Sequence, residues 1–441
     1  MGMMEQTRTP DQFFHGRILE MARAIHSGKI SAEPVKTWVS LDMDSAAKLI
    51  KHFSSTRDRG VMSRTGSDGH TGLKLFLGKA GLLGGIKRSA ARFSVGLVAL
   101  VLTGCAPVQT ASMSDDLQLI ARAKQGHVRD LRGEYRHALC PRLTGERACE
   151  DVLLRLPGEP VARHHAASNA ASLAARYRIA FVPGLFSDCA EKWLVPFADV
   201  ADELSAAGFE VNLLRVQGRA GTEQNATQLA GEIAALPHDG KHLIVFAYSK
   251  GLPDVFDLLV RHPPARQRVA AVVSYAGAAR GSPLADELRD IYDAFVTRLP
   301  IGGCAVGNGA ELEALRPGVR HAWWTTHHQK LRDTRIPFFS LVGAPLPEKV
   351  SPLLRLNHSR LAERDVNNDS QLLADDAVVP GSALLGYINA DHWVMAMPLA
   401  KQVPALAALF HDDLPRGALV GAAIEVVDSA LRTAPHSLSP P

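Results

Sequence analysis

The sequence carries little net charge and few cysteines. Its 49 Lys and Arg residues nearly balance 45 Asp and Glu residues, which gives a formal net charge of +4 over 441 residues. The first 104 residues hold 15 of the basic and 8 of the acidic residues, so the remainder is slightly acidic. This distribution argues against a nucleic-acid-binding main domain. With 46% apolar residues, the chain can still bury a large core.

The five cysteines include no C-x-x-C pair, so the sequence supports neither a zinc ribbon nor a redox motif. Cys140, Cys149, Cys189 and Cys304 form an even set, as expected in an oxidising compartment. Cys140 and Cys149 would close a short loop, and Cys189 could pair with Cys304. The connectivity is not deducible from the sequence, and four unpaired cysteines buried as small hydrophobic residues are the alternative.

A short apolar run follows a basic flank near residue 90. The uncharged segment 93–102, FSVGLVALVL, is too short to cross a bilayer as a mature helix. A basic flank, an apolar stretch and small residues are the parts of a secretory signal. The order L-T-G-C that ends at Cys105 resembles a bacterial lipobox, which implies that Cys105 is lipidated and becomes the new N-terminus. Ala106 follows rather than Asp, and this implies forwarding to the outer membrane.

Several interpretations of the N-terminal segment remain open. Secretory signals begin near the start of a chain, whereas about 85 residues precede this basic flank. Either the true start lies downstream, with Met62 as a candidate initiator, or residues 1–86 are a genuine extension before a signal peptide at 87–104. A buried apolar helix that precedes a core cysteine is a further alternative.

Apolar runs alternate with amphipathic segments from residue 176 onward. The expected strands are 178–182, 211–216, 243–247, 269–275, 336–342 and 384–388, and the expected helices are 193–207, 223–236 and 250–260. This alternation predicts an α/β fold with a mostly parallel sheet, right-handed crossovers and helices on both faces. Residues 105–175 would form a tether and an N-terminal helical region, and 433–441 a disordered tail.

One expected strand, 243–247, runs into the sequence YSKG and then into a helix. Small residues stand two positions before and two after Ser249, where a sharp strand-to-helix turn requires them. This pattern resembles the nucleophile elbow of the α/β-hydrolase superfamily, G-x-S-x-G, with Ala247 in place of the first glycine. The resemblance implies a hydrolase domain over 176–432 with a cap at about 283–335. A serine that merely caps a helix is the alternative.

In this superfamily, two backbone N–H groups bind the oxyanion that forms during acyl transfer. The resemblance implies that one belongs to Lys250, the residue after the nucleophile, and the other to the loop after an earlier strand. The strand 178–182 is followed by a Pro-Gly turn, and a glycine lets the backbone approach a substrate closely. Leu185 or Phe186 would then donate the second N–H.

The resemblance also implies a histidine base after the last strand, where His392 stands, in the chain order Ser, Asp, His. Asp369, in the turn-like sequence NNDS, and Asp376, in DAVVP, are the two candidate acids. A helix, a strand and a turn must usually fit between acid and histidine, and Asp376 leaves no room for a helix of normal length. We therefore expect Asp369, with Asp376 as the alternative. Asp375 and Asp391 are expected to be solvated or supporting carboxylates.

Together these residues predict a serine hydrolase that cleaves esters of lipids or other acyl groups through an acyl-enzyme. Such chemistry requires no metal and no organic cofactor. Histidines 321, 327 and 328 lack the helical spacing of a zinc pair and are expected on a polar cap surface. The lipid anchor predicts a place in the cell envelope, at the outer membrane or in the periplasm. A catalytically inactive, hydrolase-like lipoprotein that binds a lipid or protein partner is the alternative.

Overall fold

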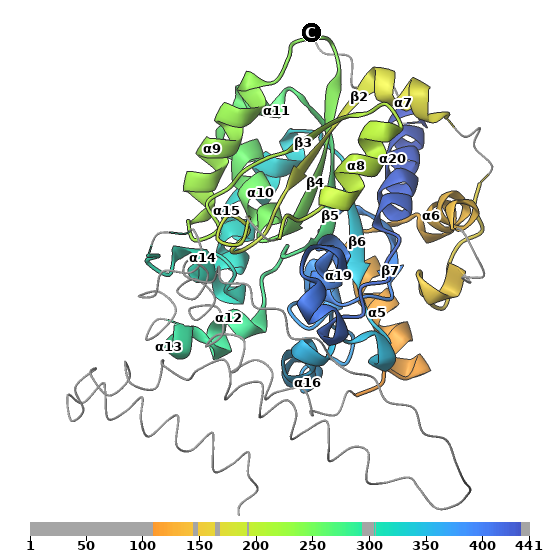
Figure 1. The fold of residues 1–441 in the computed structure, drawn as a ribbon, viewed down its shortest axis with the longest axis vertical. Helices are drawn as coiled ribbons and strands as arrows, with labels where there is room; N and C mark the ends of the chain where they lie inside the picture. Colours follow the sequence, from red (N-terminus) through yellow and green to blue (C-terminus); the bar gives the residue numbers. More distant parts are fainter. Residues whose placement is uncertain are drawn as a thin grey trace, which may run out of the picture. The chain divides into compact units, whose positions relative to one another are not determined.

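A seven-stranded sheet in which all neighbouring strands are parallel runs through the described part of the chain (Figure 1). The computed structural model describes residues 109–143, 149–163, 168–191, 194–292, 304 and 306–433. The extension at 1–86, the signal peptide at 87–104, Met62, Cys105 and all but the first residue of the tail lie outside these ranges.

The strands occur in the order β1-β7-β6-β5-β4-β2-β3 across the sheet. They are β1 (Arg129–Asp130), β2 (Tyr177–Val182), β3 (Glu210–Leu213), β4 (His242–Ser249), β5 (Val269–Gly277), β6 (Phe338–Gly343) and β7 (Ala383–Ile388). Parallel neighbours need crossover connections, and helices supply them here. The predicted fold class is confirmed.

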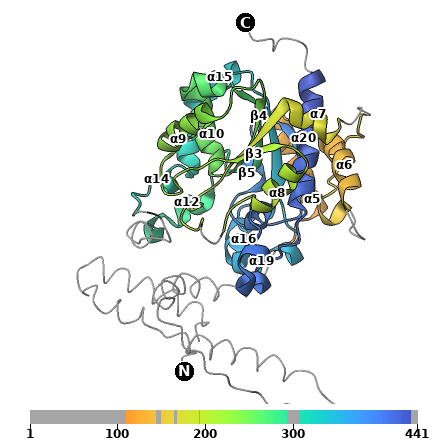
Figure 2. The ribbon, with the colours of Figure 1, turned by 45° about the horizontal axis from the view of Figure 1, so that its top comes forward.

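Helices cover both faces of the sheet (Figure 1, Figure 2). The first face carries α6 (Arg132–Leu139), α7 (Ala170–Arg176), α8 (Ala198–Ala206) and α20 (Arg416–Thr433). The second face carries α9 (Thr222–Ala235), α10 (Gly251–Arg261) and α15 (Pro317–Asp333). Successive residues of β2 alternate between them, because Ile179 and Phe181 join the first core and Ala180 and Val182 the second. Because both sides of the strand are covered, residues 179–182 are all apolar.

Several short helices complete the described chain. They are α5 (Met113–Gln125), α11 (Pro263–Arg266), α12 (Pro283–Glu287), α13 (Arg289–Ile291), α14 (Ala310–Glu313), α16 (Arg355–Ala362), α17 (Ala374–Ala377), α18 (His392–Ala396) and α19 (Leu399–Gln402). Within the described ranges, no helix is both long and apolar enough to cross a lipid bilayer.

Prolines shift two predicted boundaries. The helix expected over 193–207 begins only at Ala198, because Pro196 cannot continue a helix and Phe197 takes a left-handed conformation with φ of 62°. The strand expected over 336–342 begins at Phe338, one residue after Pro337, which lacks an N–H for the ladder. The strand expected over 211–216 ends earlier, at Leu213, because it forms the edge of the sheet.

Two regions differ from the predicted domain plan. Residues 105–175 are set apart in that plan, yet β1 lies within them and pairs with β7. Much of the predicted cap at 283–335 is α15, whose Trp323 and Leu331 are buried in the second core with α10. A crossover helix is needed between the parallel neighbours β5 and β6, and α15 fills that place.

Two disulfide bonds are present. Cys140 is bonded to Cys149, nine positions along the chain, and Cys189 is bonded to Cys304. The first bond joins the end of α6 to the turn before Leu153. Leu153 forms an isolated β-bridge with Ile388 at the end of β7. The bond therefore holds α6 close to the segment that bridges to β7.

Replacing both Cys140 and Cys149 by serine should lower the free energy of unfolding by about 2.7 kcal/mol, because a closed loop of this length restricts the unfolded chain. Urea denaturation of the double variant beside the native protein measures the difference. Equal stability would contradict a structural role for this bond.

Candidate active site

Ser249 lies on a sharp turn between β4 and α10, in a left-handed conformation with φ of 53°. A non-glycine residue in this conformation costs on the order of 1–3 kcal/mol, so the surrounding packing must enforce it. A Cβ added at Gly251 would lie 2.5 Å from the carbonyl oxygen of Pro183, and one added at Gly184 would lie 2.8 Å from the Cβ of Ser249. Glycines at both positions therefore let the backbone after β2 approach the turn that carries the serine.

His392 connects this serine to a carboxylate. Its Nε2 lies 2.9 Å from Ser249 Oγ, and its Nδ1 lies 2.7 Å from Asp369 Oδ2. The other carboxylate oxygen of Asp369 accepts hydrogen bonds from the backbone N–H groups of Gln371 at 2.9 Å and Leu372 at 2.7 Å. These donors stabilise a negative charge on a side chain that is only 1% exposed.

The imidazole of His392 is held on further sides. Its own backbone N–H donates to the carbonyl oxygen of Asp369 at 2.8 Å. Tyr248 stacks on the ring with centroids 5.0 Å apart, and its hydroxyl donates to the His392 carbonyl oxygen at 2.8 Å. Asp391 caps α18 by accepting from Val394 N–H, which fixes the turn that carries the histidine.

The alternative acid, Asp376, does not reach the histidine. It lies in α17, where burial and the neighbouring Asp375 raise its pKa to about 6. Asp375 forms an ion pair with Arg280 at 3.3 Å. The spacing argument that favoured Asp369 is wrong in one respect. It requires a helix of normal length between the acid and the last strand, whereas the α-helix between Asp369 and β7 is α17, which has four residues. Asp369 reaches His392 because its turn packs against the end of β6, where a Cβ at Gly343 would lie 2.9 Å from that of Asp369.

Asp391 is fully buried and so is not a solvated carboxylate. Burial raises its pKa, and hydrogen bonds from Ser351 and Val394 oppose that rise. Asp391 thus supports the histidine through the backbone of α18.

The three predicted oxyanion donors differ in whether their N–H groups already make a hydrogen bond. The N–H of Phe186 donates to the carbonyl oxygen of Gly218 at 3.2 Å and is therefore occupied. The N–H of Leu185 makes no hydrogen bond within the described residues. Lys250 is the N-cap residue of α10, so its N–H precedes the helical hydrogen bonds. Leu185 and Lys250 flank the serine from two segments.

The side chain of Lys250 is directed away from this role. It is 1% exposed, and its Nζ donates to Asp254 Oδ1 at 2.8 Å. Asn225 donates to the other carboxylate oxygen of Asp254 at 2.9 Å. The buried charge next to the serine is therefore paired within α10 and α9.

One group of possible metal ligands occurs among the described residues, namely Asp188, Cys189 and Cys304. Its two cysteines are joined in a disulfide and so offer no thiolate. The three histidines of α15 point to no common centre, since His327 stacks on Trp323 and His321 and His328 are exposed.

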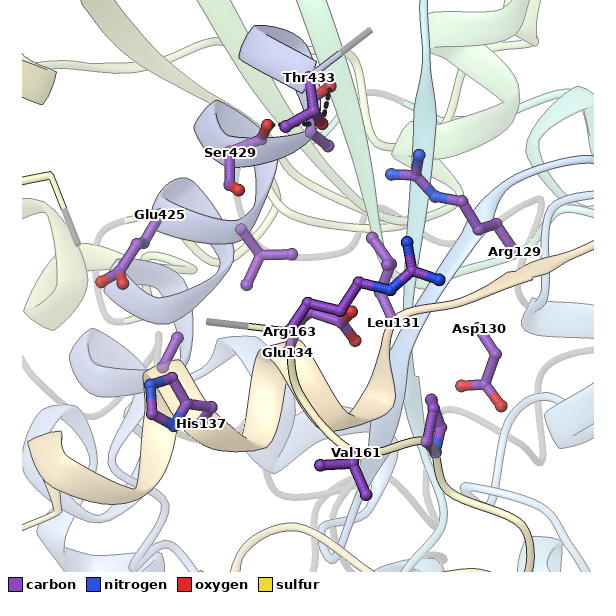
Figure 3. A pocket seen from close by; sticks show the side chains of 14 residues that line it. Arg129, Asp130, Leu131, Glu134, His137, Val161, Arg163, Glu425, Ser429 and Thr433 are labelled. Atoms are coloured by element: carbon purple, nitrogen blue, oxygen red, sulfur yellow. Dashed lines mark hydrogen bonds between the residues drawn. The ribbon is translucent and has the colours of Figure 1, made fainter. Parts of the chain in front are cut away.

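A cavity of about 400 Å³ lies between β1, α6 and α20 (Figure 3). Its polar lining includes Arg129, Glu134, Arg163 and Glu425. Ser249, His392 and Asp369 are absent from its lining. The cavity is therefore separate from the serine site.

The distances in the serine site permit a defined proton path. A hydroxyl 2.9 Å from an imidazole nitrogen can transfer its proton as the oxygen attacks an electrophile. The carboxylate 2.7 Å from the opposite nitrogen fixes the tautomer and balances the imidazolium charge that then forms.

A comparison with solved structures finds a protein of similar sequence and fold. A metagenomic carboxyl esterase, MGS0156, shares 31% sequence identity with this chain over 99% of its own length and 76% of this chain, with a TM-score of 0.64. The chain belongs to the family of this carboxyl esterase and has an α/β-hydrolase fold. No protein-family model matches the sequence, and no curated protein matches it either.

Two lipases also resemble this member of the esterase family. Mature BlEst2 lipase from Bacillus licheniformis has 20% identity over 57% of this chain and 96% of its own, with a TM-score of 0.42. Aspergillus fumigatus lipase B has 12% identity over 80% of this chain and 94% of its own, with a TM-score of 0.33.

Sequence patterns in this esterase-family chain do not reveal every residue that supports the site. The hydrogen bond of Tyr248 reaches 144 positions along the chain, and the contact of Phe186 with Gly218 reaches 32 positions. The one local signal for the approach of this loop to the serine is the Pro-Gly turn before Leu185.

Asp376→Asn should stabilise the protein above pH 7 by on the order of 2 kcal/mol, since the charged form of Asp376 is disfavoured in the fold. A folded-state pKa of about 6 exceeds the ordinary aspartate pKa of 3.8, so the native protein loses stability through this group as pH rises from about 4 to 6. Urea denaturation of the variant and the native protein at pH 4 and pH 8 measures the gain. A gain that is equal at both pH values, or a loss at pH 8, would contradict this assignment.

Proposed function

We propose that the protein is a serine carboxylic-ester hydrolase, with Ser249 as nucleophile, His392 as general base and Asp369 as the acid that orients the base. The observation that carries this proposal is the unbroken hydrogen-bond chain from Ser249 Oγ through the imidazole to Asp369 Oδ2. The similarity to a protein described as a carboxyl esterase supports an ester substrate, of lipid or other acyl type.

Acylation follows from this geometry. Ser249 Oγ attacks the ester carbonyl carbon while His392 Nε2 accepts the hydroxyl proton. The carbonyl oxygen becomes an oxyanion, for which the N–H groups of Leu185 and Lys250 are the donors. Collapse of the tetrahedral intermediate breaks the bond to the leaving alcohol, which takes the proton from His392. The acyl group then remains on Ser249 as an ester.

Deacylation uses the same groups in reverse. A water molecule donates a proton to Nε2 as its oxygen attacks the acyl carbon, and the second intermediate releases the carboxylic acid and returns the proton to Ser249. Asp369 orients the imidazole, and two backbone N–H groups donate to its other carboxylate oxygen. The scheme uses no metal and no organic cofactor.

Asp369→Asn should lower kcat for a p-nitrophenyl ester on the order of 10⁴-fold, because the amide would favour the wrong imidazole tautomer. Asp376→Asn, the matched control, should retain kcat because its side chain does not contact the histidine. Steady-state turnover with folding checked by circular dichroism compares the two. The reverse pattern would overturn the assignment of the acid.

A fluorophosphonate probe tests the class of protein. It should label the native protein on the peptide that contains Ser249 and leave Ser249→Ala unlabelled, since only an activated serine reacts. A folded native protein that resists the probe would instead support an inactive hydrolase-like protein that binds a partner.

We further propose that Cys105 carries a lipid anchor and that the protein lies in the cell envelope, at the outer membrane or in the periplasm. The order L-T-G-C after a basic flank and an apolar run supports this, as does the presence of two disulfide bonds.

Intact-mass analysis of membrane-extracted protein should give a chain that begins at Cys105 with added acyl mass. Cys105→Ser should appear as an unacylated form. A native chain that begins at Met1 or Met62 and carries no acyl mass would rule out the anchor.

A further inference from the structure

Residues 183–188 form the loop that offers the Leu185 N–H, and this oxyanion loop is held to a second turn by two opposed hydrogen bonds. Phe186 N–H donates to the Gly218 carbonyl oxygen at 3.2 Å. In return, the Gly218 N–H donates to Asp188 Oδ1 at 2.9 Å. The loop thus binds Gly218 through both its N–H and its carbonyl oxygen.

The fit between the two segments leaves no spare room. A Cβ at Gly218 would lie 2.6 Å from both Asp188 Oδ1 and the backbone nitrogen of Phe186. Phe186 itself has a φ of 60°, a strained conformation for a side chain of this size. The loop therefore depends on outside contacts to keep its shape, and Asp188 supplies one from a side chain.

A covalent bond holds the same loop from another direction. Cys189 directly follows Asp188 and is bonded to Cys304, which lies 115 positions later in the connection between β5 and β6. Near the start of that connection, Tyr292 stacks on Phe186 with ring centroids 6.2 Å apart. The oxyanion loop is thus attached to the Gly218 turn and to the connection that includes α12 to α15.

We propose that Asp188 and the Cys189–Cys304 disulfide position the oxyanion loop, so that Leu185 N–H is aligned with Ser249 before a substrate binds. This proposal rests on the hydrolase function proposed above. A Cβ at Gly184 would lie 2.8 Å from that of Ser249, so the loop lies close to the serine, and a small shift of the loop changes the distance from Leu185 N–H to the oxyanion. Loss of one oxyanion donor costs about 10²–10³ in kcat, and a displacement of about 1 Å can cost 10²-fold.

Asp188→Ala should lower kcat about 10- to 100-fold per active site with a smaller change in KM, because the oxyanion forms only after the substrate is bound. Asp188→Asn should restore most of the loss, since its amide oxygen can still accept from Gly218 N–H. The concentration of active sites is first titrated with the fluorophosphonate, so that misfolded protein does not count.

A trifluoromethyl ketone, which forms a tetrahedral oxyanion on the serine, supplies a second measurement. Its inhibition constant should rise in Asp188→Ala in parallel with the fall in kcat/KM. A purely structural role would reduce the number of titrated sites and leave kcat per site and the inhibition constant unchanged, and that result would overturn the proposal.

The disulfide is tested by a pair of double variants. Cys189→Ser with Cys304→Ser should lower kcat per titrated site about tenfold or more, whereas Cys140→Ser with Cys149→Ser should affect stability alone. Equal values of kcat per site in both variants would refute the role of the first bond. If the first variant does not fold, the Asp188 series still decides the role of the loop. Failure of the native protein to react with the probe would count against the hydrolase function itself.

Discussion

The left-handed backbone of Ser249 is the constraint on which the other parts of the site depend. It directs the hydroxyl out of the sheet at the carboxyl end of β4, and it is stable only because neighbouring backbones can approach without side chains. Gly184 and Gly251 make that approach possible. The same contact brings the oxyanion loop beside the serine, so nucleophile and oxyanion donor are positioned by one steric arrangement.

A second requirement is a carboxylate that stays charged in a buried position. Asp369 meets it through two backbone N–H donors and the imidazole, and its turn is seated against Gly343. Among the described residues no N–H group donates to the Asp376 carboxylate, and burial there raises its pKa. Asp369 and Asp376 are seven residues apart but have different surroundings. The turn of Asp369 offers backbone N–H donors to the carboxylate, and α17 offers none to Asp376 among the described residues.

The sequence predicts most of the sheet, because β2, β4, β5 and β7 each contain a run of apolar residues that is typical of a buried strand. The sequence does not predict β1, because a strand of two residues is too short to show an alternating pattern. It also does not predict α20, because glycines and β-branched residues weaken the helical signal. Ser249 and His392 are found from their positions after strands. Asp369 is chosen by a spacing rule that does not hold here, and the choice between Leu185 and Phe186 depends on Gly218, a contact that no local pattern reveals.

Trapping the acyl-enzyme tests the central claim most directly. The native protein is mixed with a p-nitrophenyl ester, quenched within the first turnover and measured by intact mass and peptide mapping. The account predicts one added acyl group on the peptide that contains Ser249, and none in Ser249→Ala. Ester turnover without any acylated protein, or an acyl group on another residue, would contradict it.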